Sequence, residues 1–119
     1  MRGFAALVLV ITCAAGHAQT LTVGSKRFTE SYILGEILSQ SAGATHKPGL
    51  GNTAILLEAL KAGSIDLYPE YTGTIAREIL KSEERLDLAA LNQKLRPLGL
   101  AASVPLGFSN SYALGMRRK

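Results

Sequence analysis

The chain has 119 residues, enough for one small domain, with a formal net charge of +4 and 47% hydrophobic residues. Thirteen Lys and Arg residues outnumber nine Asp and Glu residues, but three of the cations stand at the very end, at 117–119, and the others do not alternate with aromatic residues. A nucleic-acid-binding protein needs a clustered basic face. The charge pattern therefore argues against nucleic acid as a partner.

The first 18 residues have the pattern of a secretory signal peptide. Arg2 precedes an apolar run at 4–15, and a small residue, Ala18, closes the segment. A basic start, a short apolar run and a small-residue cleavage site define such leaders, and the run is shorter than the roughly 20 apolar residues of a membrane-spanning helix. We expect residues 1–18 to be a signal peptide and residues 19–119 to be exported to the periplasm or another extracytoplasmic space.

Few residues suited to catalysis or metal binding remain after this leader. Cys13, the only cysteine, lies inside it, which leaves the mature chain no disulfide. Acylation of Cys13 is the alternative, although Thr12 is bulkier than the residue that usually precedes a lipidated cysteine. His46 is the one remaining histidine, and we interpret it as a surface residue because no nucleophile motif accompanies it. We predict no metal and no cofactor, and a binding protein rather than an enzyme.

The mature sequence begins with a short strand followed by a helix. A strand is expected at 21–23, and the polar turn GSKRFTE follows it. Thr29 has the residue type of a helix N-cap, and Gly43 that of a helix stop. Apolar residues recur between them at helical spacing, and we expect them to face the core. They are Ile33, Leu34, Ile37 and Leu38.

Strands and helices continue to alternate along the rest of the chain. The remaining expected elements are a strand at 45–47, a helix from Asn52 or Thr53 to Gly63, a strand at 65–68, a helix after Thr72, a helix from Asp87 to Pro97, a strand or extended link at 100–104, and a strand at 111–116. This order predicts an α/β fold with a largely parallel sheet. Ligands of such sheets bind where strands lead into helices. Three polar loops have that placement: GSKRFTE (24–30), GLGN (49–52) and YPEYTGT (68–74).

These loops offer groups for both ends of a small zwitterion. Tyrosine rings at 68, 71 and 112 can attract an organic cation through their faces. Lys26, Thr74 and the helix N-termini can bind a carboxylate. A tyrosine at a strand end is also a common core residue, and a loop lysine is commonly solvated. The residue types alone leave the ligand-binding and structural interpretations open.

Three longer stretches carry a family resemblance. VGSKRFTESYILGEIL, GLGNTAILLEALKAGSIDLYPEYTGT and PLGFSNSYALGMRR resemble the substrate-binding proteins of osmoprotectant ABC transporters, the glycine betaine/carnitine/choline class. The resemblance covers nearly all of the mature chain, in the family's order. It implies a type II periplasmic-binding-protein-like fold of two hinged lobes, with the trimethylammonium group of the ligand in a tyrosine cage. It also implies delivery of the ligand to a membrane permease driven by an ATPase.

The resemblance assigns roles to four residues. Lys26 falls on the lysine that meets the ligand carboxylate, and Thr74 on a polar ligand contact. Tyr71 and Tyr112 fall on walls of the cage. Tyr68 we keep as structural, and Glu70 is expected to cap or tether its loop without a ligand contact.

Members of the family are more than twice as long as this mature chain. Residues 19–119 therefore correspond to an incomplete first lobe, with the second lobe absent, and we expect weak or undetectable binding by the chain alone because a half-site cannot enclose a ligand. Two alternatives stay open. One is a different trimethylammonium betaine, such as a sulfur-containing histidine betaine. The other is a truncated remnant that binds nothing.

Overall fold

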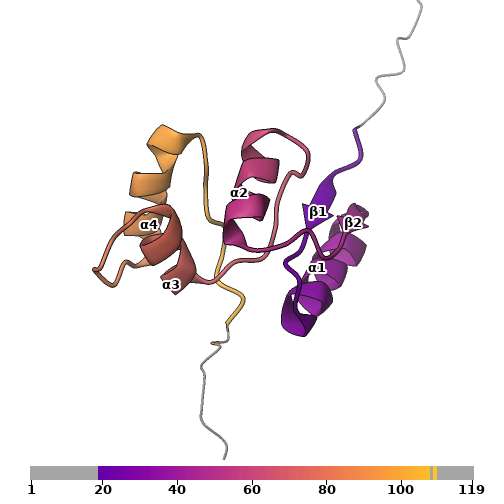
Figure 1. Ribbon diagram of the computed structural model, residues 1–119, viewed down its shortest axis with the longest axis horizontal. Coiled ribbons are helices and arrows are strands. Elements are labelled where there is room, and N and C mark those ends of the chain that lie inside the picture. The colour runs from indigo at the N-terminus through magenta and orange to yellow at the C-terminus, as the bar shows by residue number, and fades with distance from the viewer. Residues whose placement is uncertain (1–18, 108, 110–119) are drawn as a thin grey trace, which may run out of the picture.

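The computed structural model describes residues 19–107 and Ser109. Figure 1 shows the sheet and α1 on one side of α2, and α3 and α4 on the other. The expected signal peptide, Tyr112 and the strand expected at 111–116 lie outside the described residues. The elements are β1 (Thr22–Gly24), α1 (Thr29–Ala42), β2 (Thr45–Lys47), α2 (Thr53–Lys61), α3 (Thr72–Thr74), the π-helix η1 (Ile75–Ile79), α4 (Leu88–Leu95) and the 3₁₀-helix η2 (Arg96–Leu98).

The sheet is small and parallel. β1 pairs with β2 so that Val23 lies opposite His46, and a single parallel bridge joins Val23 to Leu67 on the other edge of β1. The expected strand at 65–68 is reduced to this bridge, because Pro69 has no N–H with which to continue the ladder. The predicted α/β class with parallel strands is confirmed.

β1 ends in a glycine because its neighbours approach closely. A Cβ on Gly24 would lie 2.7 Å from Cδ1 of Ile65 and 2.9 Å from Cδ1 of Leu56. Both side chains are fully or almost fully buried, as is Val23. The end of β1 is thus pressed against the main apolar cluster, and the loop that follows starts from a fixed position.

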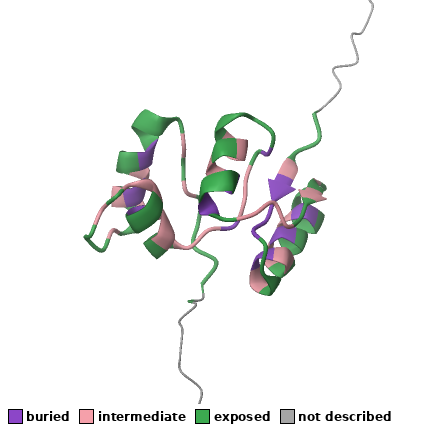
Figure 2. Ribbon diagram, in the orientation of Figure 1, coloured by how far each residue is buried: buried purple, intermediate pink, exposed green. Residues whose placement is uncertain are grey.

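Helix α1 packs on the sheet through small residues rather than apolar ones. Ile33 and Ile37 are each 55% exposed, so for these two the expectation of a core-facing position is wrong, whereas Leu34 and Leu38 are half-buried. The reason is the closeness of the contact: a Cβ on Gly35 would lie 2.5 Å from Nε2 of His46. Figure 2 shows the resulting mixture of buried and exposed positions along the helix. The buried residues of α1 are Ser31, Gly35 and Ser39.

The helix ends follow local sequence signals in most cases. Asn52 caps α2 and Asp87 caps α4, each accepting a backbone N–H three residues further on, at 3.2 Å and 2.8 Å. Gly43 ends α1 in the left-handed conformation, as expected. The expected cap at Thr29 is wrong by one residue, because Phe28 holds the N-cap position without a side-chain hydrogen bond.

The second half of the chain forms a separate helical group. α3 runs directly into η1, where the N–H of Leu80 donates to the carbonyl of Ile75 over 2.9 Å. Ala76 from η1 and Leu91 and Leu95 from α4 are its buried apolar residues. Residues 100–104 form an extended link without strand pairing. Of the helices in the described part of the chain, none is long and apolar enough to span a membrane.

Candidate functional site

Two consecutive residues after β1 point to opposite sides of the chain. Ser25 is fully buried, and its hydroxyl is hydrogen-bonded to Nε2 of His46 at 2.8 Å. Lys26 is 8% exposed, and its Nζ donates to Oε1 of Glu70 at 2.5 Å. The two side chains thus have partners in different segments, Ser25 in β2 and Lys26 in the 68–74 loop. Lys26 is therefore a buried, paired cation and not the solvated loop lysine that its residue type also allowed.

Glu70 joins three segments that are far apart in sequence. Its Oε1 accepts from Lys26 Nζ and, at 3.0 Å, from the backbone N–H of Tyr71. Its Oε2 accepts from the hydroxyl of Thr53, the first residue of α2, at 3.3 Å. The expected tethering role of Glu70 is confirmed. We call Glu70, Lys26, Thr53 and Tyr71 the Glu70 network.

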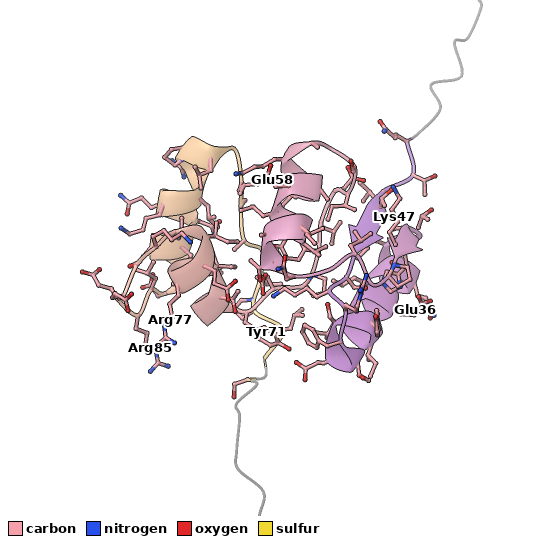
Figure 3. The ribbon with its side chains drawn as sticks, in the orientation of Figure 1. Glu36, Lys47, Glu58, Tyr71, Arg77 and Arg85 are labelled. Carbon is pink, nitrogen blue, oxygen red and sulfur yellow. The ribbon has the colours of Figure 1, made fainter. Side chains whose placement is uncertain are left out.

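Tyr71 connects this network to helix α1. Its hydroxyl donates to Oε1 of Glu30, in the first turn of α1, and the residue is half-buried. Figure 3 shows Tyr71 between α1 and α3. The bond to Glu30 fixes how the ring is turned, and it places a carboxylate beside a residue predicted to receive a cation.

The four residues predicted from sequence have different placements. The structure brings Lys26 and Tyr71 together, since both bind Glu70. Thr74, the last residue of α3, is half-buried and lies three positions after Tyr71. Tyr112 lies outside the described residues. Sequence reasoning missed Thr53 and Glu30, whose partners are 17 and 41 residues away along the chain.

A hollow of about 490 Å³ opens beside Lys26. Its lining comes from residues 26–28, residues 50–53, Ile55 and Glu78, so two of the three predicted polar loops contribute. Another hollow, of about 630 Å³, lies between η1 and the end of α4, and its lining contains no aromatic ring and no residue predicted for the site. Of these two hollows, the one beside Lys26 combines cations with the ring of Phe28 and with residues at the N-terminus of α2. Tyr71 and Thr74 are not among its lining residues.

Tyr68 has a structural environment. The residue is half-buried, and this burial raises the pKa of its hydroxyl above the usual value of 10.0, with the negative charge of Glu70 as the next cause. The hydroxyl therefore stays neutral at ordinary pH. These findings agree with the interpretation of Tyr68 as a structural residue.

A second polar arrangement lies on the other side of β1. His46 bridges Ser25 and Glu36: its Nδ1 lies 2.9 Å from Oε2 of Glu36, and its side chain is 11% exposed. The interpretation of His46 as a surface residue is thus wrong, because the close approach of α1 at Gly35 covers its ring. We call Ser25, His46 and Glu36 the His46 relay.

The relay has the residue types of a hydrolase triad, but its serine is not accessible to a substrate. Ser25 is 0% exposed, so no substrate can reach its hydroxyl. Glu36 lies at the solvent end, and hydrogen bonds from Gln40 and His46 hold the pKa of its carboxyl below the ordinary value of 4.5. The relay therefore ties β1, β2 and α1 together. Within the described residues, no three His, Cys, Asp or Glu side chains gather in a way that could hold a metal ion.

Comparison with known proteins agrees with the motifs. Residues 19–119 match the family model described as the substrate binding domain of the ABC-type glycine betaine transport system. A glycine-betaine-binding protein of Pseudomonas aeruginosa is 38% identical over 114 residues, which cover 87% of this chain. The ergothioneine transport permease/ergothioneine binding protein EgtU of Helicobacter pylori is 35% identical over 108 residues, which cover 83% of this chain. The glycine betaine-binding protein YehZ of Escherichia coli is 33% identical over 76 residues, which cover 60% of this chain.

The chain spans only part of each of these relatives: 36% of the first, 20% of the second and 25% of the third. The family model nevertheless covers every residue from 19 to the last. It describes a substrate-binding domain of a transport system and not a class of enzymes. The chain therefore belongs to the family of substrate-binding domains of ABC-type glycine betaine transport systems.

Proposed function

We propose that residues 19–119 form one wall of a binding site for a small quaternary ammonium osmoprotectant, of the glycine betaine, choline or carnitine type. The observation that carries the proposal is the shared atom of Glu70. One carboxylate oxygen holds both the ammonium of Lys26 and the backbone of Tyr71, residues 45 positions apart that are suited to opposite ends of a betaine. The family match supports the same ligand class.

The chemistry of each end follows from the groups present. The face of Tyr71 attracts a trimethylammonium group, an interaction worth about 0.5–2 kcal/mol, and the bond to Glu30 holds the ring in place. Lys26 lines the hollow and supplies a cation for the carboxylate. The family resemblance further assigns a polar ligand contact to Thr74 and a second ring to Tyr112.

The rest of the proposal concerns the protein around the site. We assign residues 1–18 to a signal peptide and residues 19–119 to the first lobe of a type II binding protein. The opposite wall belongs to a second lobe, and an ABC permease with its ATPase takes up the ligand from an extracytoplasmic space. The beginning of the family match at residue 19 supports this division.

NMR titration of the 119-residue chain labelled with ¹³C and ¹⁵N tests the proposal. Glycine betaine, choline and carnitine should each shift the Tyr71 ring signals with a Kd weaker than about 1 mM, because one wall leaves the ligand open to water. Tyr71→Ala should abolish the shifts of neighbouring signals, whereas Tyr32→Phe, a tyrosine of α1 outside the Glu70 network, should keep them. Micromolar binding by this chain would contradict the half-site, and no response to any of the three would favour a non-binding remnant.

A second candidate ligand is another trimethylammonium betaine. The 35% identity to a protein named for ergothioneine binding favours it, because a histidine betaine presents the same cationic group to a tyrosine ring. Competition between ergothioneine and glycine betaine in the same titration ranks the two. Stronger displacement by ergothioneine would move the proposal to this ligand.

A further inference from the structure

The Lys26–Glu70 ion pair is more deeply buried than the other ion pairs of the described residues. The side chain of Lys26 is 10% exposed and that of Glu70 is 5% exposed. Glu58 and Lys61, by comparison, pair at 3.5 Å with exposed fractions of 74% and 43%. A buried charge is costly unless a partner compensates it. Glu70 therefore supplies the compensating charge for Lys26 at this buried position.

The pairing leaves Lys26 able to bind a further acceptor. Within residues 19–107, the structure gives its ammonium one hydrogen-bond acceptor, Glu70. An ammonium has three donors, so donors remain on Lys26, a residue that lines the hollow of about 490 Å³. Both oxygens of Glu70, in contrast, are already used inside the protein, by Lys26 and Tyr71 on one and by Thr53 on the other.

We propose that Glu70 is the positioning residue of the site: it holds the Lys26 ammonium at the hollow with donors free for a ligand carboxylate, and through the same oxygen it fixes that ammonium relative to Tyr71. The two ends of a betaine are then received at a set separation. This inference rests on the proposed function. It adds a role for a residue that itself touches no ligand.

A merely structural tether is the competing explanation. In that case Glu70 would hold the loops together, but the position of the Lys26 ammonium would have no effect on ligand binding. The two explanations differ in what an ammonium NMR signal reports. A buried, paired lysine ammonium exchanges its protons with water slowly enough to be seen, whereas a solvated one does not.

The experiment follows the Lys26 ammonium signal in the 119-residue chain labelled with ¹³C and ¹⁵N, and this signal is assigned by its absence in Lys26→Met. Glycine betaine and tetramethylammonium at millimolar concentrations are the probes. In the native chain we expect a visible signal that betaine shifts and tetramethylammonium does not, while both probes shift the Tyr71 ring signals. Glu70→Gln should lose the ammonium signal and the betaine-specific shift but keep the ring response to tetramethylammonium.

Two variants separate positioning from tethering. Glu58→Gln neutralises the carboxylate of an exposed ion pair outside the Glu70 network and outside the hollow, and it should keep every response of the native chain. Glu70→Asp keeps the charge but withdraws the carboxylate by one methylene. It should weaken the betaine-specific shift while the backbone amide spectrum stays native, which keeps the test decisive if Glu70→Gln does not fold.

The outcomes distinguish the inference from the proposed function. A betaine-specific shift that survives unchanged in Glu70→Gln or Glu70→Asp would overturn the inference and leave the proposed function intact. The absence of a Lys26 ammonium signal in the native chain would also overturn the inference. Failure of both probes to shift any signal of the native chain would overturn the proposed function and the ligand part of the inference together.

Discussion

The Glu70 network and the His46 relay start from neighbouring residues and differ in their access to water. Lys26 leads into an ion pair whose side chains are 10% and 5% exposed. Ser25 leads through His46 to Glu36, whose side chain is 54% exposed. Loss of a partner in the first leaves a buried charge, whereas water can replace the outer partner of the second. Two polar arrangements of similar size can therefore contribute very unequally to stability.

The largest effect is expected from Glu70→Ala. Lys26 would remain as a buried cation without its partner, which costs about 3–5 kcal/mol of unfolding free energy. Urea denaturation followed by circular dichroism measures the loss, and an unfolded variant would agree with it. The double variant Lys26→Met, Glu70→Leu should be less destabilised than Glu70→Ala, because no buried charge remains.

Glu58→Ala is the matched control for this prediction. Its ion pair with Lys61 is exposed, so the loss should stay within about 1 kcal/mol. If Glu70→Ala and Glu58→Ala lost the same unfolding free energy, the predicted difference between a buried and an exposed ion pair would be wrong.

A smaller effect is expected from Gly35→Ala, which acts on the inner part of the His46 relay. The new Cβ would lie 2.5 Å from Nε2 of His46 and 3.0 Å from Cβ of Ser25, so the ring must move. Overpacking costs about 1–3 kcal/mol, and the better helix propensity of alanine returns about 1 kcal/mol. Urea denaturation should show a modest net loss. In a His46→Ala background most of that loss should disappear; an undiminished loss would mean that His46 is not the obstacle.

The smallest effect concerns the outer end of the relay and depends on pH. The pKa of Glu36 is lower in the folded protein than its ordinary value of 4.5. Its contribution to stability is therefore present above that value and is lost as the pH falls through the lowered folded pKa. Thermal unfolding between about pH 6 and pH 3 should show a shallower acid dependence for Glu36→Gln than for the native chain. Glu58→Gln controls for the loss of one negative charge, and identical curves for the native chain and Glu36→Gln would contradict the prediction.

Local sequence signals predicted much of the fold. Asn52 and Asp87 cap their helices, and Gly43 ends α1, because a cap depends only on residues a few positions away. The α/β class and the parallel pairing of strands followed from the alternation of elements. These features need no knowledge of the partner surfaces.

The features that sequence could not predict are set by tertiary contacts. Ile33 and Ile37 have the spacing of a buried face, yet the fit of His46 against Gly35 turns the small residues of α1 inward. Lys26 and Tyr71 were predicted as site residues through family resemblance, and their ligand contacts stay predictions. Their common partner could not be read from the sequence, since Glu70 lies 44 residues from Lys26.

The end of β1 also has a mechanical consequence. Ser25 is held to β2 and α1 through His46, and Lys26 is held to the 68–74 loop through Glu70. Ser25 and Lys26 are neighbours in the chain, and their backbone is also held in place. The N–H of Ser25 donates to the carbonyl of Lys47, and the N–H of Lys26 donates to the hydroxyl of Ser31. The loop that carries Tyr71 therefore cannot swing independently of α1. We therefore expect the sheet, α1 and the tyrosine loop to move as one rigid unit, with bending confined to segments outside the Glu70 network and the His46 relay.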